Sequence, residues 1–381
     1  MEAVTTIGTT SADSQTTTVP RQPLSRRLQY GAIAFAIQKL LVGPITFLSG
    51  VKQYFSPPAI RPDVVKTYPT RKHLPVRIFY PKSYDRDSGE RLPVLLTIHG
   101  GGFVVGSVHD NDDWNAAFAS RHNFLVVALN YAKAPASPFP NPIYDIEALI
   151  GSVLSDSSLP IDASRVALAG WSAGGNLCLA AAQLDSVRSG VQAVIPLYPV
   201  VDFLTKADQK ARARRYKPAL GGFRARESDF LLSMSAIFNW AYLPPGHRYD
   251  DPLLSPYYAT RETLPPNVFV IGCELDMLGH EDWRLACKLA GRREPGMDEV
   301  LGKEEVVGKG ELVLDDERFA FASDDGRYRW LLVPDTIHGF DQNISAMVRD
   351  EKLMEDARMK TDKVIGIIGE WLLSGPLKPA A

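Results

Sequence analysis

The stretch Gly-Trp-Ser-Ala-Gly-Gly-Asn at residues 170–176 constrains the fold of this chain more than any other feature of its sequence. A short apolar run with the length of a buried strand precedes it, and an Ala- and Leu-rich helical run follows at residues 177–184. A turn this sharp needs Gly170 and Gly174, because larger side chains would collide with the neighbouring strand and helix. The turn strains the backbone of Ser172 and pushes its hydroxyl out at the top of the sheet. The stretch therefore predicts either an ordinary glycine-rich turn or an exposed serine nucleophile.

Apolar runs and helical stretches alternate along the rest of the chain. Six runs have the length and composition of strands buried on both faces of a sheet, at residues 93–98, 124–129, 165–169, 193–197, 267–271 and 330–333. Helical stretches such as residues 114–120 and 143–154 separate them, and residues 76–80 alternate like a half-buried strand. Strands that alternate with helices form βαβ units. The sequence therefore predicts an α/β fold with a mainly parallel central sheet flanked by helices.

The composition is that of a soluble globular protein, with 45% hydrophobic residues, 23% charged residues and a formal net charge of -2. This charge balance gives no reason to expect nucleic acid as a partner. The three cysteines, Cys178, Cys273 and Cys287, are too few and too odd in number for a disulfide framework. They also lack the close Cys/His spacing of a zinc site. We therefore expect reduced cysteines, no metal and an intracellular, cytoplasmic protein.

The N-terminal region contains the most ambiguous stretch. Residues 1–24 are rich in Thr and Ser and lack a basic n-region, which predicts a disordered tail rather than a secretory signal. Residues 31–48 are apolar and just reach the length of a membrane span, but Lys39 and Pro44 would be costly in hydrocarbon. The helical spacing of the apolar residues favours a helix packed on the protein surface, with peripheral membrane contact as the alternative.

Two segments interrupt the alternation of strands and helices. Residues 205–242 are charged at first and then apolar and aromatic, and their length predicts a helical lid rather than a simple connection. Residues 291–328 are heavily charged, which favours a solvated surface excursion with a hairpin. The predicted division is a cap helix region at residues 25–65 and a catalytic domain at residues 66–375 that carries both insertions.

A glycine-rich loop follows the predicted strand at residues 93–98, and it consists of His99, Gly100, Gly101 and Gly102. Acyl transfer places negative charge on an oxygen, which requires preorganised N–H donors. Three consecutive glycines leave backbone amides unobstructed, so the amides of Gly101 and Gly102 are expected to form an oxyanion hole with that of Ala173. This loop makes Ser172 the predicted nucleophile.

A serine nucleophile needs a base, and the base needs a third group that orients it. In this architecture the acid and then the histidine follow the serine along the chain. His338 lies in a loop after the predicted strand at residues 330–333, and this position makes it the predicted base. His280 also follows the serine, but it stands beside Glu281 on a predicted helix and is expected to be a surface residue.

The acid has two candidates, Glu274 and Asp276, which both follow the predicted strand at residues 267–271. Their spacing of two residues does not separate them. We take Asp276 as the first candidate and keep Glu274 as the second.

Together these motifs resemble the hormone-sensitive-lipase family of α/β-hydrolases, which includes bacterial and fungal carboxylesterases and arylacetamide deacetylases. The matching motifs are His-Gly-Gly-Gly-Phe at 99–103, Asn-Tyr-Ala-Lys-Ala-Pro at 130–135, Pro-Phe-Pro at 138–140, Gly-Trp-Ser-Ala-Gly-Gly-Asn at 170–176, Ser-Pro at 255–256, Asp-Met-Leu at 276–278 with Glu281, and His-Gly-Phe at 338–340. The resemblance implies an α/β-hydrolase fold, an acid at Asp276 rather than Glu274, and a cap built from the N-terminal region and residues 205–242.

The chain departs from the family pattern at three positions near the serine. The family usually has Asp before the serine, Arg after the Tyr at 131 and Glu after the Pro at 135, whereas this chain has Trp171, Ala132 and Ala136. Our hypothesis is that these three charges form one ionic cluster in relatives. Apolar packing of Trp171 against the alanines would then replace the cluster here.

The motifs and the resemblance predict an enzyme that cleaves carboxylic esters of small to medium acyl groups through an acyl-enzyme, without a cofactor. A lactonase, an amidase or an acyltransferase would use the same three residues. A ligand-binding receptor on this scaffold is the alternative from another class, but such relatives lack one of the three. A small-molecule ester is the expected partner, and a homodimer is compatible with the sequence.

Overall fold

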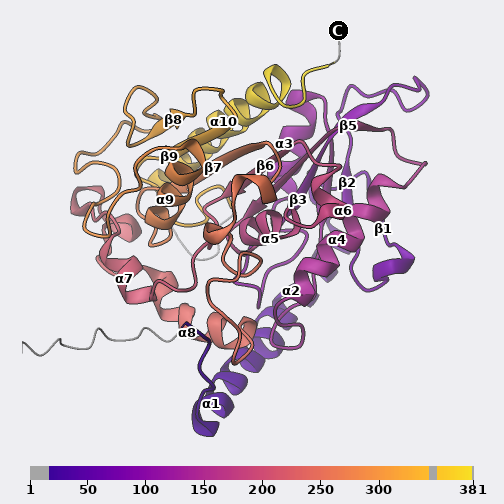
Figure 1. The fold of residues 1–381 in the computed structure, drawn as a ribbon. Helices are drawn as coiled ribbons and strands as arrows, with labels where there is room; N and C mark the ends of the chain where they lie inside the picture. Colours follow the sequence, from indigo (N-terminus) through magenta and orange to yellow (C-terminus); the bar gives the residue numbers. More distant parts are fainter. Residues whose placement is uncertain (1–16, 343–349, 380–381) are drawn as a thin grey trace, which may run out of the picture.

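The computed structural model describes residues 17–342 and 350–379 of the chain. Within these residues, nine strands form one sheet in the order β1-β2-β4-β3-β5-β6-β7-β9-β8 (Figure 1). The strands are β1 (Val64–Lys66), β2 (Val76–Phe79), β3 (Leu92–Ile98), β4 (Leu125–Leu129), β5 (Ile161–Trp171), β6 (Ala193–Leu197), β7 (Asn267–Cys273), β8 (Ala320–Ala322) and β9 (Tyr328–Val333). The six strands from β4 to β9 in this order are parallel to one another, whereas β1, β2 and β8 pair antiparallel at the two edges. The predicted α/β fold with a mainly parallel sheet is confirmed.

Helices cover both faces of the sheet and bury alternate strand residues. Val94 and Leu96 of β3 belong to the core under α4 (Asn141–Leu154), α5 (Ala173–Ala181) and α9 (Gly279–Ala290). Leu95, between them, faces the opposite core under α3 (Asp112–His122) and α10 (Glu351–Ser374). Each parallel strand is therefore apolar on both faces, which explains why these strands appear as continuous apolar runs in the sequence. A short helix, α6 (Asp185–Arg188), follows α5.

The sequence located the strands better than it located the helix ends. The run at residues 193–197 has the same bounds as β6, and the run at residues 165–169 lies inside the longer β5. The helix expected at residues 177–184 begins earlier, at Ala173, and ends at Ala181. It begins earlier because the glycines of the turn are themselves part of the helix.

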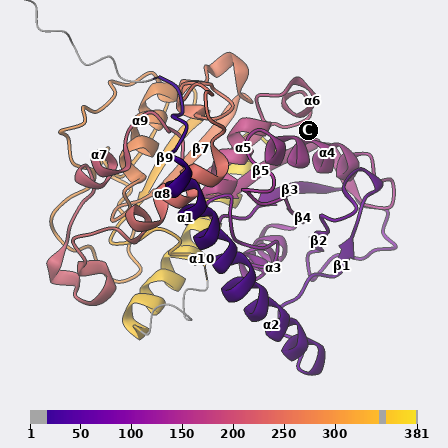
Figure 2. The ribbon, with the colours of Figure 1, turned by 90° about the horizontal axis from the view of Figure 1, so that it is seen from below.

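The segment at residues 205–242 lies over the carboxyl ends of the strands. It contains α7 (Ala207–Arg212), two 3-10 turns and α8 (Phe230–Tyr242). The N-terminal helix packs on α8, where Tyr30 meets the ring of Trp240 at a centroid distance of 6.0 Å (Figure 2). Phe238, on α8, lies against Gly102, so that α8 covers the glycine loop.

The N-terminal helix is long and is formed by α1 (Leu24–Phe35), a π-helical segment (Ala36–Val42) and α2 (Gly43–Phe55). Ala34 is buried, but from residue 39 onward almost every described side chain is exposed. The expected packing on the protein surface is therefore correct only for the first part of this helix. Among the described residues, it is also the one helix long and apolar enough to cross a membrane, by length and composition alone.

Two expectations about the ends and insertions are wrong in part. Of the tail expected to be disordered, residues 1–16 lie outside the described residues, but Val19 is buried and forms backbone hydrogen bonds with Gly246 and His247. The segment at residues 291–328 is more than a solvated excursion, because Leu301 and Phe319 are fully buried. Its hairpin is formed by β8 and β9, which pair antiparallel.

Candidate active site

Ser172 occupies the sharp turn between β5 and α5. Its backbone adopts φ 54° and ψ −116°, a conformation that is strained for a residue other than glycine. The flanking glycines allow close backbone contacts. A Cβ at Gly170 would lie 2.1 Å from the carbonyl oxygen of Gly174, and a Cβ at Gly174 would lie 2.1 Å from that of Ile98. The two glycines are therefore required by the turn, as the sequence predicts.

The structure brings Ser172, His338 and Asp276 into one hydrogen-bonded chain, although they are far apart in the sequence. The Ser172 Oγ lies 2.8 Å from His338 Nε2, and His338 Nδ1 lies 2.6 Å from Asp276 Oδ2. Asp276 follows β7 and His338 follows β9, so both loops lie at the carboxyl ends of parallel strands beside the turn after β5. A carboxylate on Nδ1 favours the tautomer with its proton there, which leaves Nε2 free to accept the serine proton.

The charges around His338 determine its proton affinity. Burial alone would lower the pKa of His338, but the charge and hydrogen bond of Asp276 outweigh burial, and Asp229 and Asp341 add to this effect. The pKa of His338 is therefore raised above its ordinary value of 6.5. The raised pKa means that the imidazolium form, which arises when His338 accepts a proton, is stabilised in this site.

Two of these carboxylates were not expected from the sequence. Asp229 comes from the segment over the site, where one oxygen caps α8 at Leu231 N and the other accepts from Met277 N at 2.9 Å. Burial raises the pKa of Asp229. An aspartate at a helix start is an ordinary N-cap signal, and nothing in the sequence indicates that it also contacts the loop of Asp276.

Asp341 is the second of these carboxylates, and it corrects the hypothesis about Trp171. The Trp171 indole donates to Asp341 Oδ2 at 2.7 Å, and the Tyr198 hydroxyl donates to the other oxygen. Trp171 packs edge-on against Trp114 at a ring distance of 5.1 Å, while Ala136 is exposed. Trp171 therefore belongs to a polar cluster behind the loop of His338. The expected apolar packing against the alanines is wrong.

The glycine loop has the backbone geometry that the sequence implies. Gly101 and Gly102 adopt φ values of 107° and 57°, and a Cβ at Gly101 would lie 2.2 Å from the carbonyl oxygen of Val105. A Cβ at Gly100 would lie 3.3 Å from Ser172 Cβ, so the loop passes directly beside the serine. Among the hydrogen bonds between described residues, none has the amide of Gly101, Gly102 or Ala173 as donor. These amides are therefore available to an oxygen at the serine.

A polar cluster holds the start of this loop. His99 Nδ1 donates to the Gly100 carbonyl at 2.8 Å, and the Tyr131 hydroxyl donates to the same carbonyl at 3.0 Å. Lys133 Nζ lies 3.1 Å from His99 Nε2. Burial lowers the pKa of His99 well below its ordinary value, and it lowers the pKa of Lys133 to about 7. His99 therefore stays neutral and anchors the glycine loop rather than reaching the serine.

Glu274, the second candidate for the acid, lies in a different cluster. Lys217 Nζ donates to Glu274 Oε2 and to Asp335 Oδ1, at 2.7 Å in both cases, and all three side chains are almost fully buried. Lys303 N and Val307 N donate to the same two carboxylates. This ion cluster therefore joins the segment over the site, the 291–328 insertion and both loops that carry Asp276 and His338.

His280 and Glu281 are both buried on α9, so the expected surface position of His280 is wrong. His280 Nε2 donates to the carbonyl of Gly296 at 2.9 Å, and the insertion covers it. Glu281 accepts from Val201 N at 2.8 Å and pairs with Lys210 of α7. Burial raises the pKa of Glu281 to about 7, against the opposing charge of Lys210. Glu281 thus supports the loop after β6 and is not part of the hydrogen-bonded chain.

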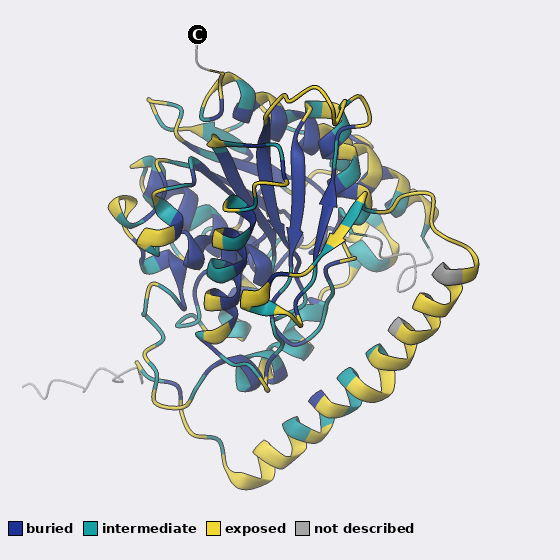
Figure 3. Cartoon of the chain, turned by 90° about the vertical axis from the view of Figure 1, so that its right-hand side faces the viewer, coloured by how far each residue is buried: buried dark blue, intermediate teal, exposed yellow. Residues whose placement is uncertain are grey.

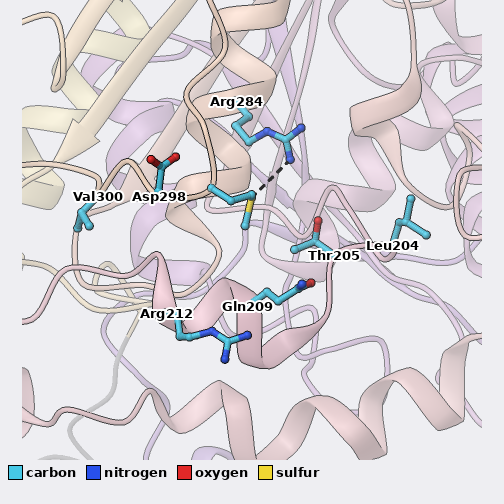
Figure 4. Close-up of a pocket in the computed structure, with 8 residues that line it drawn as sticks. Leu204, Thr205, Gln209, Arg212, Arg284, Asp298 and Val300 are labelled. Atoms are coloured by element: carbon cyan, nitrogen blue, oxygen red, sulfur yellow. Dashed lines mark hydrogen bonds between the residues drawn. The ribbon is translucent and has the colours of Figure 1, made fainter. Parts of the chain in front are cut away.

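Two hollows lie near these elements. One, of about 540 Å³, is lined by residues of α7, α9 and the insertion, and Figure 4 shows Arg284 and Asp298 across the hollow from Arg212 and Gln209. None of the three residues of the hydrogen-bonded chain lines it. The other, of about 520 Å³, is lined by Asp341 and its neighbours from the loop after His338, together with residues of α3 and α10. Within the described ranges, no group of three His, Cys, Asp or Glu side chains could hold a metal ion.

Comparison with known proteins identifies the fold family of the chain. A family model described as alpha/beta hydrolase fold matches residues 95–300, more than half of the chain. Carboxylesterase NlhH of Mycobacterium tuberculosis is 32% identical over 173 residues, which cover 41% of this chain and 53% of that protein. Arylacetamide deacetylase of Oryctolagus cuniculus is 34% identical over 249 residues, which cover 56% of this chain and 61% of that protein. The chain thus spans little more than half the length of these curated relatives.

Solved structures share the fold over nearly the whole chain. An esterase of Pyrobaculum calidifontis has a TM-score of 0.61 at 22% identity and covers 94% of this chain and 100% of its own. The metagenomic carboxylesterase EstE1 has a TM-score of 0.59 at 22% identity, and the match covers 94% of this chain and 99% of that enzyme. The strand order, the turn at Ser172 and the family match lead to one conclusion: the chain belongs to the α/β-hydrolase fold and, within it, to the hormone-sensitive-lipase family.

Proposed function

We propose that this chain hydrolyses carboxylic esters through an acyl-enzyme formed on Ser172. The observation that carries the proposal is the hydrogen-bonded chain from Ser172 through His338 to Asp276. It stands beside a glycine loop whose amides are free, and its members follow the chain order Ser, Asp, His of α/β-hydrolases. Relatives named carboxylesterase, arylesterase and arylacetamide deacetylase support ester hydrolysis as the reaction class.

In the first half-reaction, Ser172 Oγ attacks the ester carbonyl carbon while His338 Nε2 takes the hydroxyl proton. Asp276 holds the ring and stabilises the imidazolium. The amides of Gly101, Gly102 and Ala173 donate to the oxyanion of the tetrahedral intermediate. When this intermediate collapses, the carbon–oxygen bond to the alcohol breaks and the alcohol leaves with the proton of His338.

In the second half-reaction, water takes the place of the alcohol. His338 removes its proton, the hydroxide attacks the acyl-enzyme, and the acid leaves as Ser172 recovers its proton. Two side chains of α8 limit the space above Ser172, because Phe238 lies against Gly102 and the ring of Phe230 lies 6.3 Å from the ring of His338. This limited space supports small to medium acyl groups.

The test is Ser172→Ala. The variant should lose turnover of p-nitrophenyl acetate, because the nucleophile is gone, while its melting temperature stays close to that of the wild type. Ser235→Ala is the matched control, since Ser235 on α8 donates only to the carbonyl of Leu232, and this variant should keep its activity. Retained activity in Ser172→Ala would overturn the assignment. A panel of p-nitrophenyl esters graded by acyl length then measures the longest acyl group that the space under α8 accepts.

A further inference from the structure

The long N-terminal helix carries a large share of the exposed apolar surface of this protein. Its exposed large side chains are Leu24, Leu28, Phe35, Leu40, Leu41, Ile45, Phe47, Leu48, Val51 and Phe55. In Figure 3 the helix runs along the outside of the molecule, with most of its residues exposed. A contiguous apolar surface of this kind on a globular domain marks a contact with another apolar body.

The exposed apolar residues from the end of the π-helical segment through α2 are arranged on one side. Leu40, Phe47 and Val51 are spaced by seven and four residues, which places them on the same side of the helix. They are 68%, 70% and 41% exposed, respectively. Leu41 and Leu48 form the adjacent row. Two adjacent apolar rows make an amphipathic helix of the type that enters a lipid surface.

The charge of this region indicates which surface would bind it. Between Asp13 and Asp63 the sequence has no acidic residue. In the same interval it has six basic residues, namely Arg21, Arg26, Arg27, Lys39, Lys52 and Arg61, all of which are exposed. Basic side chains beside an apolar helical face are attracted to anionic lipid headgroups. A second copy of the chain fits less well, because a two-fold contact of this face with itself would bring like charges together.

The attachment of both helix ends decides how the helix meets a membrane. Before the helix, Val19 N donates to the carbonyl of His247 at 2.8 Å, and Gly246 N donates to that of Val19 at 2.8 Å. After it, β1 pairs with β2, and Asp63 N donates to the carbonyl of Ile78 at 2.9 Å. A spanning helix would place its two ends on opposite sides of a hydrocarbon layer of about 30 Å. Both ends are held by the same domain, so the helix has to lie in the plane of the surface.

We propose that the helix at residues 24–55 lies in the plane of an anionic lipid surface and docks the protein there. The apolar rows enter the boundary between headgroups and acyl chains, and the basic side chains pair with the headgroups. This docking goes beyond ester hydrolysis and does not depend on it.

The same helix is connected to the glycine loop. Gln38 Nε2 donates to the carbonyl of Val104 at 2.7 Å and to that of Ala134 at 2.8 Å. Val104 follows the glycine loop, and Ala134 belongs to the segment whose Lys133 contacts His99. Docking therefore brings the glycine loop close to the lipid surface, where an apolar ester would be concentrated.

Vesicle sedimentation of the full chain tests the proposal. The vesicles are phosphatidylcholine alone and phosphatidylcholine mixed with phosphatidylserine. We expect binding to the mixed vesicles that salt weakens, and little binding to phosphatidylcholine alone. Leu40→Glu/Phe47→Glu should reduce binding by about tenfold or more. Lys39→Gln/Lys52→Gln should reduce it by about thirtyfold, because two surface cations are removed. Melting temperatures show that the variants are folded.

Val306→Glu/Leu314→Glu is the matched control, since both side chains are exposed apolar residues of the insertion, at 46% and 59%. This variant should bind like the wild type, and so should Ser172→Ala, whether or not the chain is an esterase. Absence of binding to mixed vesicles, equal binding to both compositions, or an equal loss in the control would each overturn the proposal. A wild-type dimer in size-exclusion chromatography that Leu40→Glu/Phe47→Glu converts to a monomer would assign the face to a second copy instead.

Discussion

The indole nitrogen of Trp171 and Oδ2 of Asp341 lie 2.7 Å apart, and this bond joins β5, which ends just before Ser172, to the loop that follows His338. Asp341 is partly buried, and this burial raises the pKa of its carboxyl group. Tyr198 donates to the other oxygen, and its ring meets the edge of the His338 ring at 4.8 Å. The residue before the nucleophile therefore helps to position the loop of the base.

Removal of this donor should destabilise the protein. In Trp171→Phe, one oxygen of the partly buried Asp341 loses its partner, and we expect a loss of about 1–3 kcal/mol in the free energy of unfolding. The loop of His338 also loses an anchor, so kcat should fall more than KM changes. Urea unfolding and ester kinetics measure the two effects. In Trp171→Phe/Asp341→Asn the carboxylate charge that lost its donor is removed, and part of the lost unfolding free energy should be recovered. If the double variant were the sum of its single variants, the two residues would not be coupled.

The pH dependence of the reaction should reflect the charges around His338. Protonated His338 cannot accept the proton of Ser172, so kcat/KM should fall as the pH drops through the pKa of His338, which lies above 6.5. Asp229→Asn removes one of the charges that raise this pKa, and the acid limb of the profile should therefore shift to lower pH. Asn still caps a helix well, so α8 should persist. Asp250→Asn is the control, since Asp250 pairs with Arg248 away from His338, and its profile should match the wild type. An unchanged limb in Asp229→Asn would contradict the assigned role of this charge.

The Lys217 cluster should be costly to break. Lys217→Met leaves Glu274 and Asp335 buried without their counter-charge, and we expect a loss of about 3–5 kcal/mol in the free energy of unfolding. Lys309→Met should cost about 0–1 kcal/mol, because Lys309 of the 291–328 insertion forms a half-exposed pair with Glu355 of α10. Chemical denaturation of both variants measures the difference. Equal losses of unfolding free energy in the two variants would mean that the buried cluster stabilises the protein no more than the exposed pair does.

The close contact between Gly102 and Phe238 predicts a steric effect on activity. Gly102→Ala places a Cβ 2.4 Å from the Phe238 ring and also forces φ 57° on an L-residue, which alone costs about 1–2 kcal/mol. Activity should fall strongly. Phe238→Ala in the same chain should restore part of it. Gly89→Ala is the control for backbone strain, since Gly89 also has a positive φ, of 70°, and open space around it. If Phe238→Ala restored nothing, the contact would not be the cause.

The sequence predicted the sheet because each parallel strand is apolar on both faces and appears as a continuous run. It also pointed to Ser172 and His338, because chain order and loop position limit the choice. It could not separate Asp276 from Glu274 without the family resemblance. The structure separates them by burying Glu274 with Lys217, which is 57 residues away in the sequence. Charged residues in a sequence usually indicate solvent. The burial of Lys217 and His280 depends on partners that only the complete fold brings together.

The Lys217 cluster also limits how this protein can be recombined with its relatives. A segment transplanted from another protein at residues 205–242 would lose the lysine that neutralises Glu274 and Asp335. Both carboxylates would remain next to the loops of Asp276 and His338, in an interior that cannot solvate them. A successful graft therefore has to replace residues 205–242 together with Glu274 and Asp335. The segment at residues 205–242 and the loops that carry Asp276 and His338 therefore form a single exchangeable unit.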